Sequence, residues 1–464
     1  MTQSRPPIVV ILGHVDHGKT TLLDYLRQSN ISAREAGGIT QSTRSFQFQS
    51  PASPPITFID TPGHEAFSAM RSRGSKIADL AVLVVAADDG VQPQTLQSID
   101  FIKSSGIPYV VAITKSDVKS ADPDRVKTQL TEHAVIVEDF GGDVPSVAIS
   151  AKTGAGIPDL LDIIGLLAQL HPPVADPQGP LEAVVLESRL NPQTGSTAVV
   201  IVKNGSLTIG QKLFQAAEIG KVRSLLDSDG HNLASAPPSL PVEIIGLSVV
   251  PPAGSLISDS PMSVALPVAP AASVASPDAE LQLVVKADVT GSLEALLASL
   301  PATVQIMSAG IGEVTESDVT LAHHAHCPIV AFNVKVPASV SKLAEIDKVQ
   351  IFSHKIIYEL LDQVEKLKHP QIREEILGQG VVLAEFKIGP DRIAGCKVTD
   401  GLIERGAQVR FLRDSVAIGD TRIRSLKSAK SDIPSAKAGT EFGAVFHPYV
   451  DFKVGDTLIA YKIL

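Results

Sequence analysis

One run of residues near the start of the chain has the types and spacing needed to hold phosphate groups. The pattern G-x-x-x-x-G-K-[ST] is matched by Gly13, His14, Val15, Asp16, His17, Gly18, Lys19 and Thr20. Glycines let the backbone N–H groups turn toward phosphates at a helix N-terminus. Lys19 is expected to reach the terminal phosphates, and Thr20 to supply a hydroxyl to Mg²⁺. We count the neighbouring Thr21 among the nucleotide-binding residues.

A second motif follows the next apolar run. Asp60-Thr61-Pro62-Gly63 ends that run, and an acid at a strand end can hold Mg²⁺. Gly63 allows a backbone N–H close to the last phosphate. Asp, Pro and Gly are also ordinary turn residues, so only the loop upstream makes this motif informative.

Two further segments could select the base. Lys115 and Asp117 follow a later apolar run, and a carboxylate there can accept hydrogen bonds from N1–H and the exocyclic amine of guanine. Adenine cannot offer that pair. Ser150, Ala151 and Lys152 follow the next run and can present a backbone N–H to the guanine O6. Ligands of open parallel sheets bind at the carboxyl ends of the strands, which is where all these motifs fall.

The elements that must position these residues alternate between strand and helix. Near-continuous apolar runs indicate strands buried on both faces, and helix-length stretches such as Thr20–Gln28 and Pro93–Ser104 lie between them. This alternation predicts a doubly wound parallel sheet. The expected strands are Ile8–Leu12, Ile56–Ile59, Leu80–Ala86, Tyr109–Ile113 and Val147–Ile149.

The remainder of the chain changes character several times, and the expected fold class is multidomain α/β and β. Short alternating runs with turn residues predict a β-barrel, in which Asn204-Gly205 is a hairpin signal. A Pro/Ala/Ser-rich linker, a small α/β domain, a connecting helix around Lys355–Leu367 and a C-terminal β-barrel follow. The expected boundaries are 1–173 for the P-loop domain, 174–258, 259–279, 280–353, 354–372 and 373–464.

Composition excludes some classes. The chain has 464 residues, 44% hydrophobic and 19% charged, with a net charge of −10, which suits packed domains rather than a disordered chain. Residues 375–464 carry slightly more Lys and Arg than Asp and Glu, which is weak support for RNA contact. Two distant cysteines, no signal or transit peptide and no long apolar span predict a cytoplasmic protein that does not enter a membrane.

Taken together, the motifs resemble those of the translational GTPases. Gly13–Thr20, Asp60–His64 and Thr114–Asp117 look like the signature elements of that family. The resemblance implies that the ligands are GTP and GDP with Mg²⁺, that Thr40 binds Mg²⁺, and that His64 positions the attacking water.

The resemblance also assigns roles to neighbouring residues. Asp16 would help to order the activated state, and Val15 and Ile39 would form an apolar gate that keeps His64 back. Thr114 stands where the family usually has Asn to brace the P-loop. This substitution concerns nucleotide affinity rather than guanine selection.

The rest of the chain resembles bacterial translation initiation factor two. The stretches that carry the resemblance are Glu35–Gln41, Lys286–Ala295, Thr315–Val319, Ile393–Cys396 and Ser425–Lys427. It covers residues 8–258 and 280–464, without the N-terminal extension common in that family. It implies a monomer whose partners are both ribosomal subunits and formylmethionyl initiator tRNA.

The tRNA would bind to the last barrel. The positions carried over by the resemblance are Cys396, Lys427, Lys430, Glu441 and Gly443. Cations suit acceptor-strand phosphates, but a buried core cysteine and a solvated barrel edge are alternatives for Cys396 and for the two lysines. Ser428, Ala429 and Phe442 depart from the family pattern.

Two other patterns have ordinary explanations. Gly310-Ile311-Gly312 is too short to predict a nucleotide site, because Thr315 and Asp318 explain it as a helix start. The cluster of His323, His324, His326 and Cys327 fits no zinc-ligand spacing.

The sequence therefore predicts a ribosomal factor controlled by GTP, and two alternatives stay open. One is a specialised elongation factor that carries another aminoacyl-tRNA. The other is a ribosome-tethered scaffold that has lost tRNA recognition.

Overall fold

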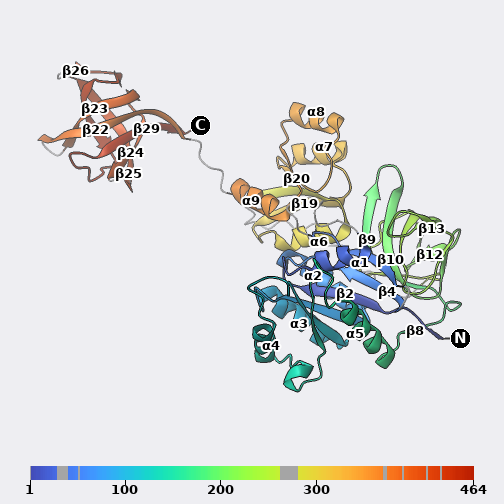
Figure 1. Ribbon diagram of the computed structural model, residues 1–464. Coiled ribbons are helices and arrows are strands. Elements are labelled where there is room, and N and C mark those ends of the chain that lie inside the picture. Colours follow the sequence, from blue (N-terminus) through green and yellow to red (C-terminus); the bar gives the residue numbers. More distant parts are fainter. Residues whose placement is uncertain are drawn as a thin grey trace. The chain divides into compact units, whose positions relative to one another are not determined.

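The computed structural model describes residues 2–28, 40–50, 53–261, 281–368, 374–388, 391–413, 416–428 and 431–463. The chain forms two compact units, residues 1–368 and 369–464 (Figure 1). Both contain the kinds of layer that the sequence predicts, so the expected fold class is confirmed. Among the described residues, no helix is long and apolar enough to cross a membrane.

The first unit begins with a six-stranded sheet in the order β3-β4-β2-β5-β6-β7. Its strands are β2 Ile8–Gly13, β3 Arg44–Ser50, β4 Ser53–Asp60, β5 Leu80–Ala86, β6 Tyr109–Thr114 and β7 Ser146–Ala148. Its helices are α1 Lys19–Arg27, α2 Ser68–Ile77, α3 Pro93–Ser105, α4 Pro123–Glu132 and α5 Ile157–Leu170, with short turns η3 Glu65–Phe67 and η4 Glu138–Phe140. The loops after β2, β4, β6 and β7 all leave the same edge of the sheet, because these strands are parallel.

Apolar side chains fill both faces of this sheet. One face packs against Ile77 of α2, Ile99 of α3 and Val126 of α4, and the other against Leu22 of α1 and Leu160 of α5. The sequence missed β3, which pairs antiparallel with β4 at the sheet edge. Its polar and apolar residues alternate, as expected for an edge strand with one buried face.

The second part of this unit is a small barrel. Its main sheet has the order β12-β13-β16-β10-β9-β17, and a bridge between Phe214 and Ser258 brings its two ends together. The strands are β9 Glu182–Asn191, β10 Gly195–Asn204, β11 Leu207–Thr208, β12 Lys212–Phe214, β13 Glu218–Leu226, β14 Asn232–Leu233, β15 Ser235–Ala236, β16 Pro241–Leu247 and β17 Leu256–Ile257. The hairpin expected at Asn204-Gly205 was wrong, because β10 pairs with β9 and β16 while β11 pairs with β15.

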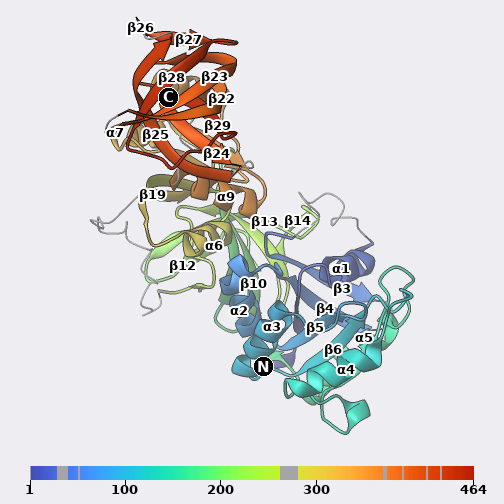
Figure 2. The ribbon, with the colours of Figure 1, turned by 90° about the vertical axis from the view of Figure 1, so that its left-hand side faces the viewer.

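The third part is a parallel sheet in the order β19-β18-β20-β21. The elements are β18 Leu281–Ala287, α6 Thr290–Ser299, β19 Val304–Ile311, α7 Glu316–His324, β20 Ile329–Phe332, α8 Ala338–Ile346, β21 Ile351–His354 and α9 Ile357–Lys368. Thr315 and Asp318 form a capping box at the start of α7, which confirms the helix start. The sequence missed α8 and β21. Helix α6 lies beside α2 of the first sheet (Figures 1 and 2).

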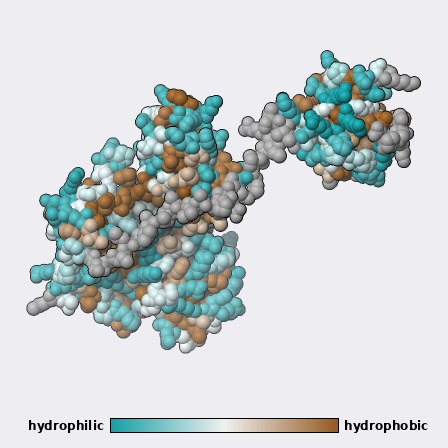
Figure 3. Space-filling model, turned by 180° about the vertical axis from the view of Figure 1, so that it is seen from behind, coloured by the Kyte–Doolittle hydropathy of each residue, from teal (hydrophilic) through white to brown (hydrophobic). Residues whose placement is uncertain are grey.

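The second unit is a barrel. Its strands follow the order β22-β29-β24-β25-β28-β23-β27, and a pairing of β22 with β23 closes it. They are β22 Glu374–Ile388, β23 Asp391–Glu404, β24 Gln408–Arg413, β25 Val416–Ser428, β26 Ser431–Asp432, β27 Ser435–Lys437, β28 Glu441–His447 and β29 Thr457–Ile463. Phe411, Phe446 and Phe452 pack inside it. Hydrophilic residues cover much of the face of this barrel seen in Figure 3.

The first unit also contains a separate pair of short antiparallel strands, β1 Gln3–Ser4 and β8 Val174–Ala175.

Candidate functional site

The predicted phosphate-binding loop joins β2 to α1, and its backbone needs unusual conformations. Gly13, Asp16 and Gly18 have φ values of 146°, 61° and 88°. A Cβ at Gly13 would lie 2.3 Å from the carbonyl oxygen of Val84. Glycine is therefore required at that position, because both the φ angle and the space exclude a side chain.

Lys19 is buried within this loop. Its ammonium donates to the carbonyl oxygens of Gly13 at 3.0 Å and His14 at 2.5 Å. Burial lowers the pKa of Lys19 to about 8, and the neighbouring charge of Asp60 opposes this shift. A phosphate beside this ammonium would stabilise its charged form, which burial disfavours.

Three oxygen-bearing side chains, two hydroxyls and one carboxylate, are candidates to hold Mg²⁺ near Lys19. The hydroxyls of Thr20 and Thr40 are 2.6 Å apart, and Asp60 is buried at the end of β4, close enough to influence the pKa of Lys19. Hydroxyl and carboxylate oxygens are the ligands that Mg²⁺ prefers. The chemistry of these residues therefore fits a Mg²⁺ ion, and the ion itself stays a prediction.

A cleft of about 410 Å³ runs along these loops at the carboxyl edge of the sheet. It brings together predicted residues from five segments. The residues that line it are Val15, Asp16, Gly18, Lys19, Thr20, Thr21, Thr40, Gly63, His64, Thr114, Lys115, Asp117, Val118, Ala151 and Lys152. Ser150 is buried behind the cleft, and its hydroxyl donates to Asp117 at 2.7 Å. This hydrogen bond lowers the pKa of Asp117 and keeps it an acceptor for a base with paired donors.

Thr114 braces the phosphate-binding loop despite being shorter than asparagine. Its hydroxyl donates to the carbonyl oxygen of His17 at 2.5 Å and lies 3.5 Å from that of Val85. The hydroxyl is buried, so the bond is protected from water. The residue thus joins the loop to the end of β6.

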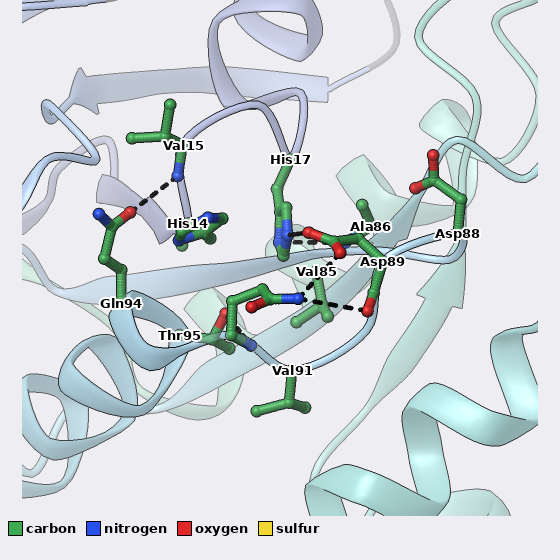
Figure 4. Close-up of polar contacts among 12 residues, drawn as sticks. His14, Val15, His17, Val85, Ala86, Asp88, Asp89, Val91, Gln94 and Thr95 are labelled. Atoms are coloured by element: carbon green, nitrogen blue, oxygen red, sulfur yellow. Dashed lines mark hydrogen bonds and ion pairs between the residues drawn. The ribbon is translucent and has the colours of Figure 1, made fainter. Parts of the chain in front are cut away.

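The side chain of His17 points toward the end of β5 (Figure 4), and His17 does not line the cleft. Its Nδ1 accepts from the N–H of Ala86 at 3.2 Å, so Nε2 carries the hydrogen and donates to Asp89 at 3.0 Å. This bond lowers the pKa of Asp89, and burial lowers the pKa of His17. His14, His17 and Asp89 lie close enough together to hold a metal ion. A metal bound to Nε2 of His17 would, however, leave the hydrogen on Nδ1, where it would face the N–H of Ala86. The group is a brace rather than a metal site.

Sequence reasoning missed two residues that hold the site loops. Gln94 of α3 accepts from the N–H of Val15 at 3.0 Å (Figure 4). Arg71 of α2 is fully buried and donates to the carbonyl oxygens of Pro62 at 3.1 Å and Gly63 at 2.9 Å, and also to that of His64. Burial lowers the pKa of Arg71 to about 10. Neither residue lies in a motif, so no signal in the sequence indicated either role.

His64 lines the cleft and follows Gly63, which packs closely on Lys19. A Cβ at Gly63 would lie 2.7 Å from the Lys19 ammonium and 2.9 Å from Val15. The imidazole bonds through Nδ1 to the hydroxyl of Tyr358, while Nε2 is buried without a hydrogen-bond partner among the described residues. Burial and the charge of Lys19 lower the pKa of His64. Ile39, the other expected gate residue beside Val15, lies outside the described residues.

Four of the positions assigned to tRNA lie on three neighbouring strands of the second unit. Cys396 of β23 faces Phe442 of β28, and Gly443 of β28 faces Lys427 of β25. Lys427 and Glu441 are exposed, but Cys396 lies in the barrel core, where burial raises its pKa to about 12. Contact between its thiol and a ligand would require the core to open. Lys430 lies outside the described residues.

Three family models match successive parts of the chain. Residues 4–169 match the elongation factor Tu GTP binding domain family, residues 180–260 match elongation factor G domain 2, and residues 271–365 match translation-initiation factor 2. The first of these matches is to the GTP-binding domain of a translational GTPase, which is the expected enzyme class.

Curated relatives match almost the whole chain. Translation initiation factor IF-2 of Parvibaculum lavamentivorans is 40% identical over 99% of this chain and 56% of its own length. The factors of Rhodopseudomonas palustris and Moorella thermoacetica are each 41% identical, over 100% and 99% of this chain and 57% and 55% of their own lengths. Among solved structures, GDP-bound aIF5B from Aeropyrum pernix has a TM-score of 0.49 at 26% identity, covering 99% of this chain and 92% of that chain.

The predicted resemblance to bacterial translation initiation factor two is thus confirmed. The chain spans a little over half the length of the curated relatives that it matches.

Proposed function

We propose that this chain is a GTP-dependent translation initiation factor. It binds formylmethionyl initiator tRNA, promotes the joining of ribosomal subunits and hydrolyses GTP on the ribosome. The observation that carries the proposal is the meeting of Thr20 and Thr40 hydroxyls, 2.6 Å apart, beside the buried Lys19 in a chain similar to IF-2 throughout. That arrangement suits a nucleoside triphosphate with its metal ion.

The chain's own residues would act by positioning and by charge. Lys19 and the backbone N–H groups of the loop bind the phosphates, and Asp117 selects guanine. Thr40 and Gly63 belong to the two segments that can contact the last phosphate. Whether these segments are ordered would therefore depend on whether that phosphate is present. Asp16 and His64 would order the site and orient a water molecule. Bound Mg²⁺, held by Thr20, Thr40 and Asp60, would neutralise charge on the phosphate oxygens.

Slow hydrolysis away from the ribosome is expected. His64 bonds to Tyr358 through one ring nitrogen, and its other nitrogen is buried. That second nitrogen can orient a water molecule only once the residues that bury it have moved, while the bond from Tyr358 to Nδ1 stays in place. The ribosome would supply that rearrangement, as the proposed sequence of binding, subunit joining and hydrolysis requires.

A test of the proposal follows GTP hydrolysis by the full chain with ribosomal subunits and Mg²⁺. We expect strong stimulation by ribosomes and its loss in His64→Ala. Asp117→Asn is the specificity control, because an amide presents donors to the base and should shift use from GTP to XTP. A hydrolysis rate that ribosomes do not increase, or that His64→Ala does not lower, would contradict the proposal.

A second candidate is the ribosome-tethered scaffold without tRNA recognition. The observation that favours it is in the second unit, where Cys396 is a core residue facing Phe442 and the hydroxyl of Ser428 donates to the carbonyl oxygen of Glu441 at 3.1 Å. Those groups satisfy one another rather than a ligand. A specialised elongation factor is less well supported, because residues 271–365 match the initiation-factor family.

A further inference from the structure

The expected hydrolytic histidine is held by a helix from another part of the chain. Tyr358, the second residue of α9, brings its hydroxyl to 2.7 Å from Nδ1 of His64. The two rings also meet edge to face, with centroids 4.8 Å apart and planes at 78°. A hydrogen bond and a ring contact together fix both the position and the rotation of the imidazole.

The protonation states make this bond directional. Burial lowers the pKa of His64, and Lys19 adds to the effect against the charge of Asp16. Burial also raises the pKa of Tyr358, as does the charge of Glu65. Both groups are therefore neutral near pH 7. A phenol is the better donor and an imidazole nitrogen the better acceptor, so Nδ1 accepts and the ring hydrogen is on Nε2.

Helix α9 is in turn fastened to the loop that carries Thr40. The side chain of Gln41 donates to the carbonyl oxygen of Lys355 at 2.9 Å and accepts from the N–H of Ile357 at 3.1 Å. It thereby satisfies a free N–H at the start of α9. Tyr358 is the next residue, so the contact of Gln41 sets where its ring can lie.

The same helix is anchored through the core. Ile357 and Leu360 are fully buried in one apolar cluster with Phe67 and Met70, which follow His64 in the chain. Helix α9 also lies against β20 and β21 (Figure 1). The loop that carries Thr40 and the loop that carries His64 therefore both contact the start of α9. Neither of these contacts involves a residue of the sheet β19-β18-β20-β21.

We propose that Tyr358 is a positioning residue for GTP hydrolysis, whose hydroxyl holds His64 in a single tautomer with Nε2–H left for the reaction. The hold depends on α9 being fastened by Gln41, so a displacement of α9 changes the state of His64. This inference rests on the proposed GTPase function. It assigns Tyr358 and Gln41 roles in that function that the sequence analysis did not give them.

The direct test is nitrogen NMR of the full chain labelled with ¹⁵N-histidine, with His64→Gln used to assign the His64 signals. We expect a pure Nε2–H tautomer in the unaltered chain and a mixture of tautomers in Tyr358→Phe, which keeps the ring and loses only the oxygen. Gln41→Ala should produce a smaller change in the same direction. Tyr449→Phe removes a phenol oxygen in the second unit and should leave the signal unchanged. An unchanged tautomer in Tyr358→Phe overturns the proposal, and if that variant does not fold, Gln41→Ala decides in the same way.

Kinetics provide a second test that a merely structural role would not satisfy. In single-turnover hydrolysis, Tyr358→Phe should lower the rate constant about threefold to tenfold, as for the loss of one hydrogen bond, with GTP affinity unchanged. In the His64→Gln background it should have no further effect. Additive losses, or a faster reaction in Tyr358→Phe, would overturn the proposal. If the unaltered chain hydrolyses no GTP even with ribosomes present, the proposed function fails, while the tautomer measurement still tests the role of Tyr358.

Discussion

The nucleotide cleft of the first unit and the expected tRNA face of the second unit are built in different ways. In the cleft, residues from five segments converge, and further side chains hold them, including Gln94, Thr114 and Arg71. On the barrel, the expected residues lie along three adjacent strands. There Cys396 belongs to the core, and Lys427 is exposed with Asp432 3.8 Å away.

The difference shows what kind of function leaves a mark on a sequence. A phosphate site needs backbone N–H groups, and only certain residues allow the chain to turn as Gly13 and Gly18 do. A site on a barrel face depends on side chains alone, since any residue can adopt the strand backbone. Replacing one such side chain leaves the fold intact and changes the ligand surface.

The largest contrast should come from removing one lysine in each region. Lys19→Met should weaken GTP binding roughly a thousandfold, because loss of one partner of a buried charge pair costs about 3–5 kcal/mol. Lys427→Met should weaken binding of formylmethionyl initiator tRNA less than about tenfold, because an exposed charge contributes about 1 kcal/mol or less. Equilibrium titrations with labelled nucleotide and tRNA measure both. Equal losses in the two variants would break the comparison.

The titration of Lys19 gives the same contrast a pH dependence. Its pKa is lowered to about 8 by burial, and bound phosphate would raise it. Binding should therefore take up a proton near pH 8, and GTP affinity should fall as the pH rises above 8. Calorimetry in buffers of different ionisation enthalpy detects this uptake. Its absence at pH 8.5 would contradict the assigned position of the ammonium.

Buried carboxyl groups should make the two units respond to pH in opposite directions. Glu187 of β9 accepts from the N–H of Gly291 at 2.7 Å and the hydroxyl of Thr290 at 2.9 Å, with Arg73 and Asp288 as the nearby charges. Burial raises its pKa from 4.5 to about 7. The folded form therefore holds the proton more tightly. The stability it contributes is present below pH 4.5 and is lost as the pH rises to about 7, by about 3 kcal/mol at most.

The second unit should show the reverse sign. The hydrogen bond from Arg413 lowers the pKa of Asp456, so its contribution is present at neutral pH and is lost on acidification below the usual range. Thermal melts from about pH 2 to pH 8 of the unaltered chain and of Glu187→Gln measure the first effect, and the same melts of Asp456→Asn measure the second at the acid end of the range. A pH profile of the first transition that is unchanged in Glu187→Gln would show that another group is responsible.

Arg71 should affect catalysis more than binding. Arg71→Met removes the donors to three consecutive carbonyl oxygens, those of Pro62, Gly63 and His64. We expect a loss of about 2 kcal/mol, or roughly thirtyfold, in ribosome-stimulated hydrolysis. Arg125→Met, which removes a surface guanidinium on α4, is the matched control. A loss in Arg125→Met as large as that in Arg71→Met would mean that general destabilisation is the cause.

These predictions depend on different amounts of sequence information. The strands before each motif were predicted to within a few residues because runs such as Leu80–Ala86 are buried on both faces. Arg71 and Tyr358 could not be predicted, because their partners are set by how α2 and α9 pack. Strand β3 was missed because an edge strand has only one apolar face, and the pairing at Asn204-Gly205 was wrong because a local turn signal does not specify which strands pair.

The smallest expected effect concerns the departure from the usual guanine motif. Thr114→Val removes the hydroxyl that donates to His17 while preserving shape, and should weaken GDP and GTP binding by about 1 kcal/mol, roughly fivefold. Guanine preference over adenine should not change, since Asp117 determines it. Nucleotide titration measures both quantities. A lost preference would mean that Thr114 takes part in base selection.

The measurement that tests the central claim most directly follows spontaneous hydrolysis of the ester bond of formylmethionyl initiator tRNA in the presence of the full chain and GTP. The proposed initiation function predicts that the chain slows this hydrolysis, and that it does so much less for unformylated or elongator tRNA. Unchanged hydrolysis at high protein concentration would contradict it and would favour the tethered scaffold, in which Cys396 and its neighbours serve only the core of the barrel.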